Sequence, residues 1–193
     1  MTKKIVDSLI ANGTVPSEDR ELYEYGIRQG SLMVINVVTS ILIGMFLGMI
    51  LQSIVFILTY IPMRTYAGGY HASTQLRCYL LSIPFMLIAL LGIRIIPWNG
   101  YICLGTLFLI VLVIYRLAPV ENANRPFSKM EFKIFKKRTR IITSVFCFVA
   151  LLFWVTEMKQ IAASIIMALL MISIMLILGL LKNNKTIFIE AEV

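Results

Sequence analysis

The chain has 193 residues, of which 59% are hydrophobic and only 15% are charged, and its mean hydropathy is +0.87. This composition excludes an ordinary soluble domain and indicates a membrane protein. The net charge of +8 would favour nucleic-acid binding in a soluble protein, but in a membrane protein topology explains the basic residues, so we expect no nucleic-acid partner.

The residues ahead of the first apolar stretch are mixed and polar, which argues against a cleavable signal peptide. Residues 16–29 predict a short amphipathic helix lying along the membrane surface, with an ordinary polar extension as the alternative. We therefore expect residues 1–29 to form a cytoplasmic segment that contains this interfacial helix.

The first apolar stretch, 31–63, is too long for one span, because a bilayer core needs roughly 20 helical residues. Gly44 and Gly48 interrupt it, so we expect two helices at about 30–45 and 48–63, joined by a tight hairpin. A single long tilted helix is the alternative. Further apolar stretches lie at 79–97, 101–115, 141–156 and 161–181. The predicted fold is all-α and polytopic, with about six transmembrane helices over 30–181 and a cytoplasmic tail over 182–193.

The basic residues favour six spans over five, because Lys and Arg gather on the cytoplasmic side of membrane proteins. With six spans and both termini cytoplasmic, the outer side holds only Arg94 and Lys159. A five-span arrangement would separate the basic N-terminus from the basic loop at 116–140. The predicted inner residues are Lys3, Lys4, Arg20, Arg28, Arg64, Arg77, Arg116, Arg125, Lys129, Lys133, Lys136, Lys137, Arg138, Arg140, Lys182 and Lys185.

The most unusual polar segment, 64–78, connects the second and third predicted spans. It holds the only histidine, His71, and Cys78, the one cysteine outside the clearly apolar runs. A thiol becomes an effective nucleophile when an imidazole accepts its proton, so these residue types suit a cysteine peptidase. The alternative is that His71 is a solvated loop residue and Cys78 a small apolar filler.

On one straight helix, seven residues would separate His71 and Cys78 by about 10 Å, too far for a hydrogen bond. Gly68 and Gly69 permit a backbone turn that would fold Tyr70 and His71 back over the next helix. Ser73 or Thr74 is a suitable N-cap, which would leave Cys78 in the second turn of that helix, where the helix dipole modestly favours a thiolate.

The pattern Arg64-x-x-x-Gly68-Gly69-x-His71, followed by Cys78, resembles the accessory gene regulator protein B (AgrB) family of bacterial membrane peptidases. The basic central loop and the Pro-containing segment 118–122 are also similar to that family. The resemblance implies a thiol protease of quorum sensing, with Cys78 as nucleophile and His71 as its base. Such enzymes remove the C-terminal tail of an AgrD-like peptide precursor and support its cyclisation to a thiolactone or lactone. It also implies a homodimer in the bacterial cell membrane, with the active site at the cytoplasmic face.

Other residues have supporting interpretations. Arg64 could bind a substrate carboxylate, brace the loop or anchor the span at the interface, and backbone amides near Gly69 or the helix start could stabilise an oxyanion. No metal site is expected, because the chain has one His and no Cys-x-x-Cys pair, and no cofactor is expected either. The candidates for a third residue that orients His71 are Glu121, Asn122 and Glu131.

The loop at 116–140 has eight basic residues against two acidic ones, which suits an acidic precursor tail or anionic lipids, although topology alone also explains it. A peptide transporter is the main functional alternative, but it predicts ionisable residues inside several spans, and these contain almost none. A noncatalytic scaffold would tolerate Cys78→Ser. A serine intramembrane protease is disfavoured, because no Gly-x-Ser-x-Gly pattern occurs.

Overall fold

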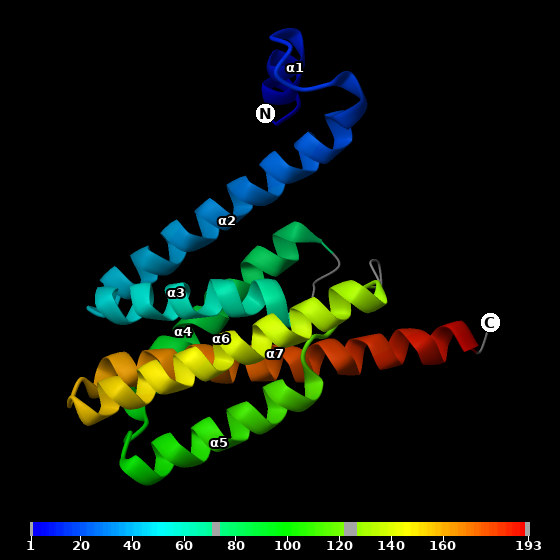
Figure 1. The fold of residues 1–193 in the computed structure, drawn as a ribbon. Helices are drawn as coiled ribbons and strands as arrows, with labels where there is room; N and C mark the ends of the chain where they lie inside the picture. Colours follow the sequence, from blue (N-terminus) through cyan, green and yellow to red (C-terminus); the bar gives the residue numbers. More distant parts are fainter. Residues whose placement is uncertain (1, 71–73, 122–126, 192–193) are drawn as a thin grey trace. The chain divides into compact units, whose positions relative to one another are not determined.

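The computed structural model describes residues 2–70, 74–121 and 127–191, and every regular element in these ranges is helical (Figure 1). Six of the helices, α2 to α7, are long and apolar enough to cross a membrane. The predicted all-α polytopic fold with six spans is therefore confirmed. The helices are α1 (Thr2–Ala11), the 3-10 turn η1 (Ser17–Asp19), α2 (Arg20–Phe46), α3 (Ile50–Ala67), α4 (Gln75–Ile95), α5 (Gly100–Leu117), α6 (Lys129–Val155) and α7 (Lys159–Ala191).

The chain divides into two compact units, Met1–Thr39 and Ser40–Val193. In the first unit, the Arg20 guanidinium pairs with Asp7 at 2.6 Å and with Glu24 at 3.1 Å. Val6 and Val15 are buried there. These contacts attach α1 to the first turns of α2.

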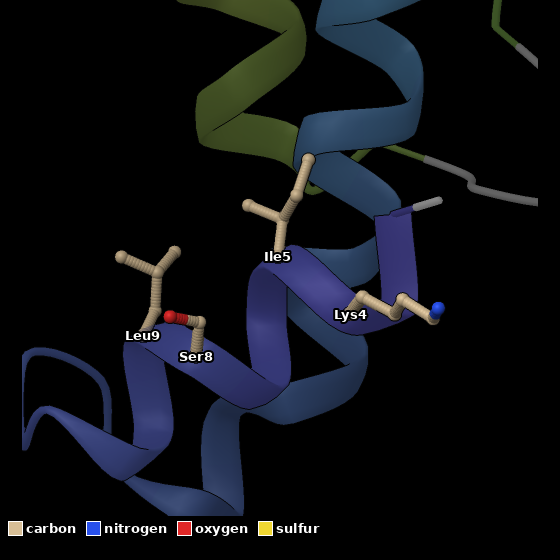
Figure 2. A pocket seen from close by; sticks show the side chains of 4 residues that line it. All are labelled: Lys4, Ile5, Ser8 and Leu9. Carbon is tan, nitrogen blue, oxygen red and sulfur yellow. The ribbon is translucent and has the colours of Figure 1, made fainter.

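Residues 17–29 are helical as expected, but they do not form a separate short helix. Residues Ser17–Asp19 form only one 3-10 turn, and from Arg20 the chain continues as α2 to Phe46 without a break. Gly26 does not end the helix because its backbone stays helical and nothing crowds it. The short separate helix at the amino terminus is α1. Figure 2 shows four of its side chains, Lys4, Ile5, Ser8 and Leu9, which line a surface hollow of about 350 Å³.

The predicted hairpin between the first two spans is present, and its two glycines have different roles. Gly48 has a φ of 67°, in the left-handed region that favours glycine. Gly44 allows a close helix contact, because a Cβ there would lie 2.5 Å from the Cβ of Ser53. The Ser53 hydroxyl donates to the Ser40 carbonyl at 2.8 Å, which also joins α3 to the end of α2.

The last span, α7, is the core of the second unit. It packs against α3, α4, α5 and α6, and most of its apolar length is buried (Figure 1). Its buried residues join two apolar clusters, one with α3, α5 and α6 and one with α3 and α4. Large apolar side chains on the other helices are exposed, as expected where lipid is the solvent. Therefore α7 is the most deeply buried span of the bundle.

Within the second unit, α3 to α7 alternate in direction, so several helix ends gather at one end of the bundle (Figure 1). This end, called the site end below, holds the carboxyl ends of α3, α5 and α7 and the amino ends of α4 and α6. The described residues 68–70 and 118–121 lie there, in the connections from α3 to α4 and from α5 to α6. All of the sequence-predicted site residues belong to these connections or to the helix turns beside them.

Candidate active site

Cys78 lies in the first turns of α4, and a cap fixes the start of this helix. Thr74 is the N-cap, and its hydroxyl accepts a hydrogen bond from the Arg77 amide at 3.3 Å. The Cys78 amide donates to the Thr74 carbonyl at 3.1 Å. The predicted Thr74 cap is confirmed, and Cys78 is the fourth helical residue, close to the positive end of the helix dipole.

The three cysteines differ in access. The Cys78 side chain is exposed, Cys103 is buried in α5, and Cys147 is half-buried in α6. All three are free thiols. Cys78 is therefore the thiol that a substrate can reach most directly, in agreement with the packing role expected of the other two.

His71 lies outside the described residues, with Ala72 and Ser73, and so does Asn122. The pairing of His71 with Cys78 thus remains a prediction. The residues on either side are described: Tyr70 precedes His71 directly, and Thr74 begins the helix of Cys78. The contacts of Tyr70 show how the chain is held immediately before the histidine.

Gly68 and Gly69 turn the chain at the end of α3. Their φ angles are 73° and 111°, both in the region that L side chains rarely adopt. The turn is also crowded, since a Cβ at Gly68 would lie 2.1 Å from the Val120 carbonyl oxygen. At Gly69 it would lie 2.7 Å from Nη1 of Arg64 and 2.9 Å from the Met175 oxygen. Glycine is therefore required at both positions by conformation and by space.

Backbone hydrogen bonds hold this turn between two distant parts of the chain. On one side, the Val120 amide donates to the Ala67 carbonyl at 2.9 Å, and the Gly69 amide donates to the Val120 carbonyl at 3.4 Å. On the other side, the Tyr70 amide donates to the Met175 carbonyl of α7 at 2.8 Å. The sequence singled out segment 118–122 only by resemblance, and the structure places Val120 of this segment directly against the glycine pair.

Arg64 braces the same turn from its inner side. Its guanidinium donates to the carbonyl oxygens of Gly68 and Tyr70. Among the three interpretations of Arg64, this geometry favours the loop brace. The planar guanidinium suits this task, because its several N–H donors have a fixed arrangement that can reach two acceptors at once.

Tyr60, which the sequence did not indicate, belongs to the same region. It lies one helical turn before Arg64 on α3, and its side chain is half-buried. Its ring stacks on Phe56 at 5.5 Å between centroids. The only available signal was the spacing of four residues between Tyr60 and Arg64, which places both on one face of a helix.

Two of the three candidates for a histidine-orienting residue are described. The Glu131 carboxylate accepts from the Ser128 amide at 2.8 Å, and the Ser128 hydroxyl accepts from the Glu131 amide at 3.2 Å. This reciprocal pair is a capping box at the start of α6. For Glu121, the backbone carbonyl accepts from the Asn183 side-chain amide at 2.9 Å. Glu131 therefore has a structural role that needs no catalytic explanation.

The amino-terminal half of α6 contains arginines that bond to neighbouring helices and lysines that are exposed. Arg138 lies 5.3 Å from the centre of the Tyr66 ring and donates to its hydroxyl at 3.2 Å, while Arg140 donates to the Tyr115 carbonyl at 3.2 Å. These two arginines join α6 to α3 and α5. An exposed row, called the lysine stripe below, lies at intervals of one helical turn: Lys129, Lys133 and Lys137.

Comparison with known proteins gives a consistent result. Residues 2–176 match the protein family described as Accessory gene regulator B. An AgrB-like protein of Listeria monocytogenes is 30% identical over 166 residues, which cover 82% of this chain and 79% of the relative. AgrB-like proteins of Listeria innocua and Clostridium perfringens are 31% and 23% identical, covering 82% and 79% of this chain and 79% and 75% of the relatives. No solved structure matches.

Proposed function

Because this chain belongs to the accessory gene regulator B family, and is thereby part of the accessory gene regulator system, we propose that it is a membrane cysteine endopeptidase that processes a quorum-sensing peptide precursor. The observation that carries the proposal is the exposed thiol of Cys78 at the capped start of α4. A family match over residues 2–176 supports the reaction class, and the braced glycine turn before His71 supports the site.

The proposed chemistry is acyl transfer through a thioester. His71 accepts the thiol proton, and the Cys78 sulfur attacks the carbonyl carbon of the scissile peptide bond to form a C–S bond. As the tetrahedral intermediate collapses, the C–N bond breaks and the imidazolium gives its proton to the leaving amine. The upstream peptide remains on Cys78 as a thioester, and the C-terminal tail leaves with a free amino group.

Ring closure follows from the same intermediate. A thioester keeps its acyl carbon activated, so a Cys or Ser side chain within the peptide can attack it. His71 accepts the proton of the attacking thiol or hydroxyl, the new S–C or O–C bond replaces the bond to Cys78, and the Cys78 thiolate is regenerated as a thiolactone or lactone forms. Water competes for the thioester, so a site that excludes water and holds the two peptide ends together favours the ring.

The site end supplies features that suit this reaction. In the first turn of α4 the Arg77 amide is bound by the Thr74 cap, whereas the amides of Gln75 and Leu76 have no carbonyl partner within the helix and can stabilise an oxyanion. The lysine stripe of α6 offers positive charge for an acidic precursor tail. The positive-inside rule assigns this end to the cytoplasm. Partners in the proposal are therefore the precursor, the bilayer and a second copy of the chain.

The test is to co-express a candidate AgrD-like precursor with wild-type, Cys78→Ala and His71→Ala protein and to follow the precursor by mass spectrometry. The matched controls are Cys103→Ala and Cys147→Ala, which remove the two less accessible thiols. We expect the wild type and both controls to release the tail, with an adduct on Cys78, and both site variants to release none. Normal processing by Cys78→Ala would contradict the proposal and favour a peptide transporter.

A further inference from the structure

The inner face of the glycine turn lies directly on the backbone of α7. The Tyr70 amide donates to the Met175 carbonyl at 2.8 Å. One helical turn later, at Gly179, a Cβ would lie 2.8 Å from both the Gly69 carbonyl carbon and the Tyr70 nitrogen. The contact is between main chains, so a side chain at position 179 would have no flexible neighbour to displace.

The next residues of α7 continue this contact. The Lys182 ammonium lies 5.2 Å from the centre of the Tyr70 ring, which allows a cation–π interaction. The Asn183 side chain donates to the Glu121 carbonyl at 2.9 Å, in the segment that pairs with Gly68 and Gly69. The carboxyl end of α7 therefore touches both connections that form the site end.

A Cβ at position 179 would force either the glycine turn or α7 to shift. Both Met175 and Gly179 are buried, and α7 is packed among four helices. Arg64 of α3 and Val120, which follows α5, also hold the turn through hydrogen bonds. A methyl group at 179 needs more than 3.4 Å, the ordinary van der Waals contact distance, so the gap of 2.8 Å must widen by several tenths of an ångström. Because four close-packed helices surround α7, the clash is relieved by a shift of the turn and not by a shift of α7.

We propose that Gly179 is a positioning residue of the active site, and that α7 from Met175 to Asn183 is the platform on which the chain before His71 is seated. The inference rests on the proposed function, because a shift of the glycine turn affects catalysis only if His71 acts as the base of Cys78. Tyr70 is joined to His71 by a peptide bond, so a displaced Tyr70 displaces the base relative to Cys78. A misplacement of about 1 Å in a catalytic group can cost roughly a hundredfold in rate.

The test compares Gly179→Ala with Gly105→Ala. Both replace a helical glycine, but a Cβ at Gly105 meets nothing within 4 Å. With the precursor as substrate, we expect Gly179→Ala to lower kcat by roughly tenfold with little change in KM, because the shift is smaller than the misplacement of about 1 Å that costs a hundredfold. Gly105→Ala should keep the wild-type kcat. Both variants should retain the thermal transition of a folded bundle.

Amide hydrogen exchange supplies a readout that does not depend on catalysis. The peptide containing residues 68–70 should exchange faster in Gly179→Ala than in the wild type, while peptides from α5 and α6 stay unchanged. If Gly179→Ala fails to fold, Asn183→Ala is the second variant, with a smaller loss of kcat and the same local exchange. A wild-type kcat together with unchanged exchange would overturn the proposal, as would faster exchange with a wild-type kcat.

The two failures are distinguishable. If the proposed peptidase function is wrong, His71→Ala and Cys78→Ala process the precursor normally, whatever the behaviour of position 179. If only the positioning role is wrong, those two variants are inactive while Gly179→Ala retains the wild-type kcat.

Discussion

Arg64 and Tyr70 are joined by a hydrogen bond from the guanidinium to the Tyr70 carbonyl, so a charged side chain of α3 is bound to the residue just before His71. The same guanidinium also reaches the Gly68 carbonyl. Its positive charge is therefore directed at two backbone dipoles within the protein. In this geometry the fork of Arg64 holds a turn, and a lysine would not reproduce it.

We expect Arg64→Lys to reduce precursor processing by about ten- to a hundredfold, because one ammonium cannot replace a planar fork at two carbonyls. Processing is measured as tail release at equal protein levels in membranes. Arg94→Lys at the opposite end of α4 is the control and should retain full activity. Full activity of Arg64→Lys would show that positive charge alone suffices.

Gly68→Ala should destabilise the protein far more than Gly48→Ala. Both residues have positive φ, but a Cβ at Gly48 meets nothing within 4 Å, whereas at Gly68 it would lie 2.1 Å from the Val120 oxygen. We expect a loss of about 1 kcal/mol at Gly48 from backbone strain and about 3 kcal/mol or more at Gly68. Thermal unfolding in detergent compares the two, and equal losses would contradict this role of Val120.

Thiol labelling should follow the exposure of the three cysteines. In single-cysteine variants, we expect a maleimide to modify Cys78 fastest, Cys147 more slowly and Cys103 only after unfolding. An impermeant maleimide added to intact cells should spare Cys78 and should label it in inside-out vesicles. Labelling of Cys78 in intact cells would contradict the cytoplasmic placement.

Glu131→Gln should leave processing unchanged, because glutamine also serves in a capping box and a catalytic carboxylate would not tolerate the change. Ser128→Ala should lower stability by about 1 kcal/mol through loss of the α6 cap. Tail release and thermal unfolding are measured on both variants. A loss of tail release in Glu131→Gln without loss of stability would return Glu131 to the catalytic candidates.

Replacing the lysine stripe by glutamine, as Lys129→Gln with Lys133→Gln and Lys137→Gln, should raise KM for a precursor with an acidic tail and leave kcat nearly unchanged. The wild-type KM should rise with ionic strength, and the variant's KM should depend less on salt, because exposed charges are screened. The control exchanges Lys3 and Lys4 for glutamine. A KM that ignores both salt and the stripe would indicate that these lysines serve topology alone.

The sequence predicted those features that depend on local composition. Span number, the hairpin at Gly44 and Gly48 and the Thr74 cap follow from hydropathy, backbone freedom and N-cap preference, and all three are confirmed. The start of α2 was missed because nothing at Gly26 or Gly30 forces the helix to end. A helix can continue from the membrane into a polar segment whenever no residue stops it.

The contacts around the candidate site were not predictable, because they are tertiary. Val120 and Met175 bond to the glycine turn through their backbone atoms. Every residue type has a backbone carbonyl, so the sequence cannot indicate such a contact. Gly179 would have been read as a tolerated helical glycine in an apolar run. Its importance depends on Gly69 and Tyr70, which are more than a hundred positions away in the sequence.

The burial of α7 has a consequence for biosynthesis. Because α7 follows every other span, the ribosome delivers the acceptor carbonyl of Met175 only after Cys78 and the glycine turn have already entered the membrane. Until α7 inserts, the Tyr70 amide lacks its acceptor on Met175, and the two apolar clusters lack the side chains that α7 contributes. The bundle and its site end therefore become ordered at the same step. A nascent chain without α7 has the Cys78 thiol but not the ordered glycine turn beside it.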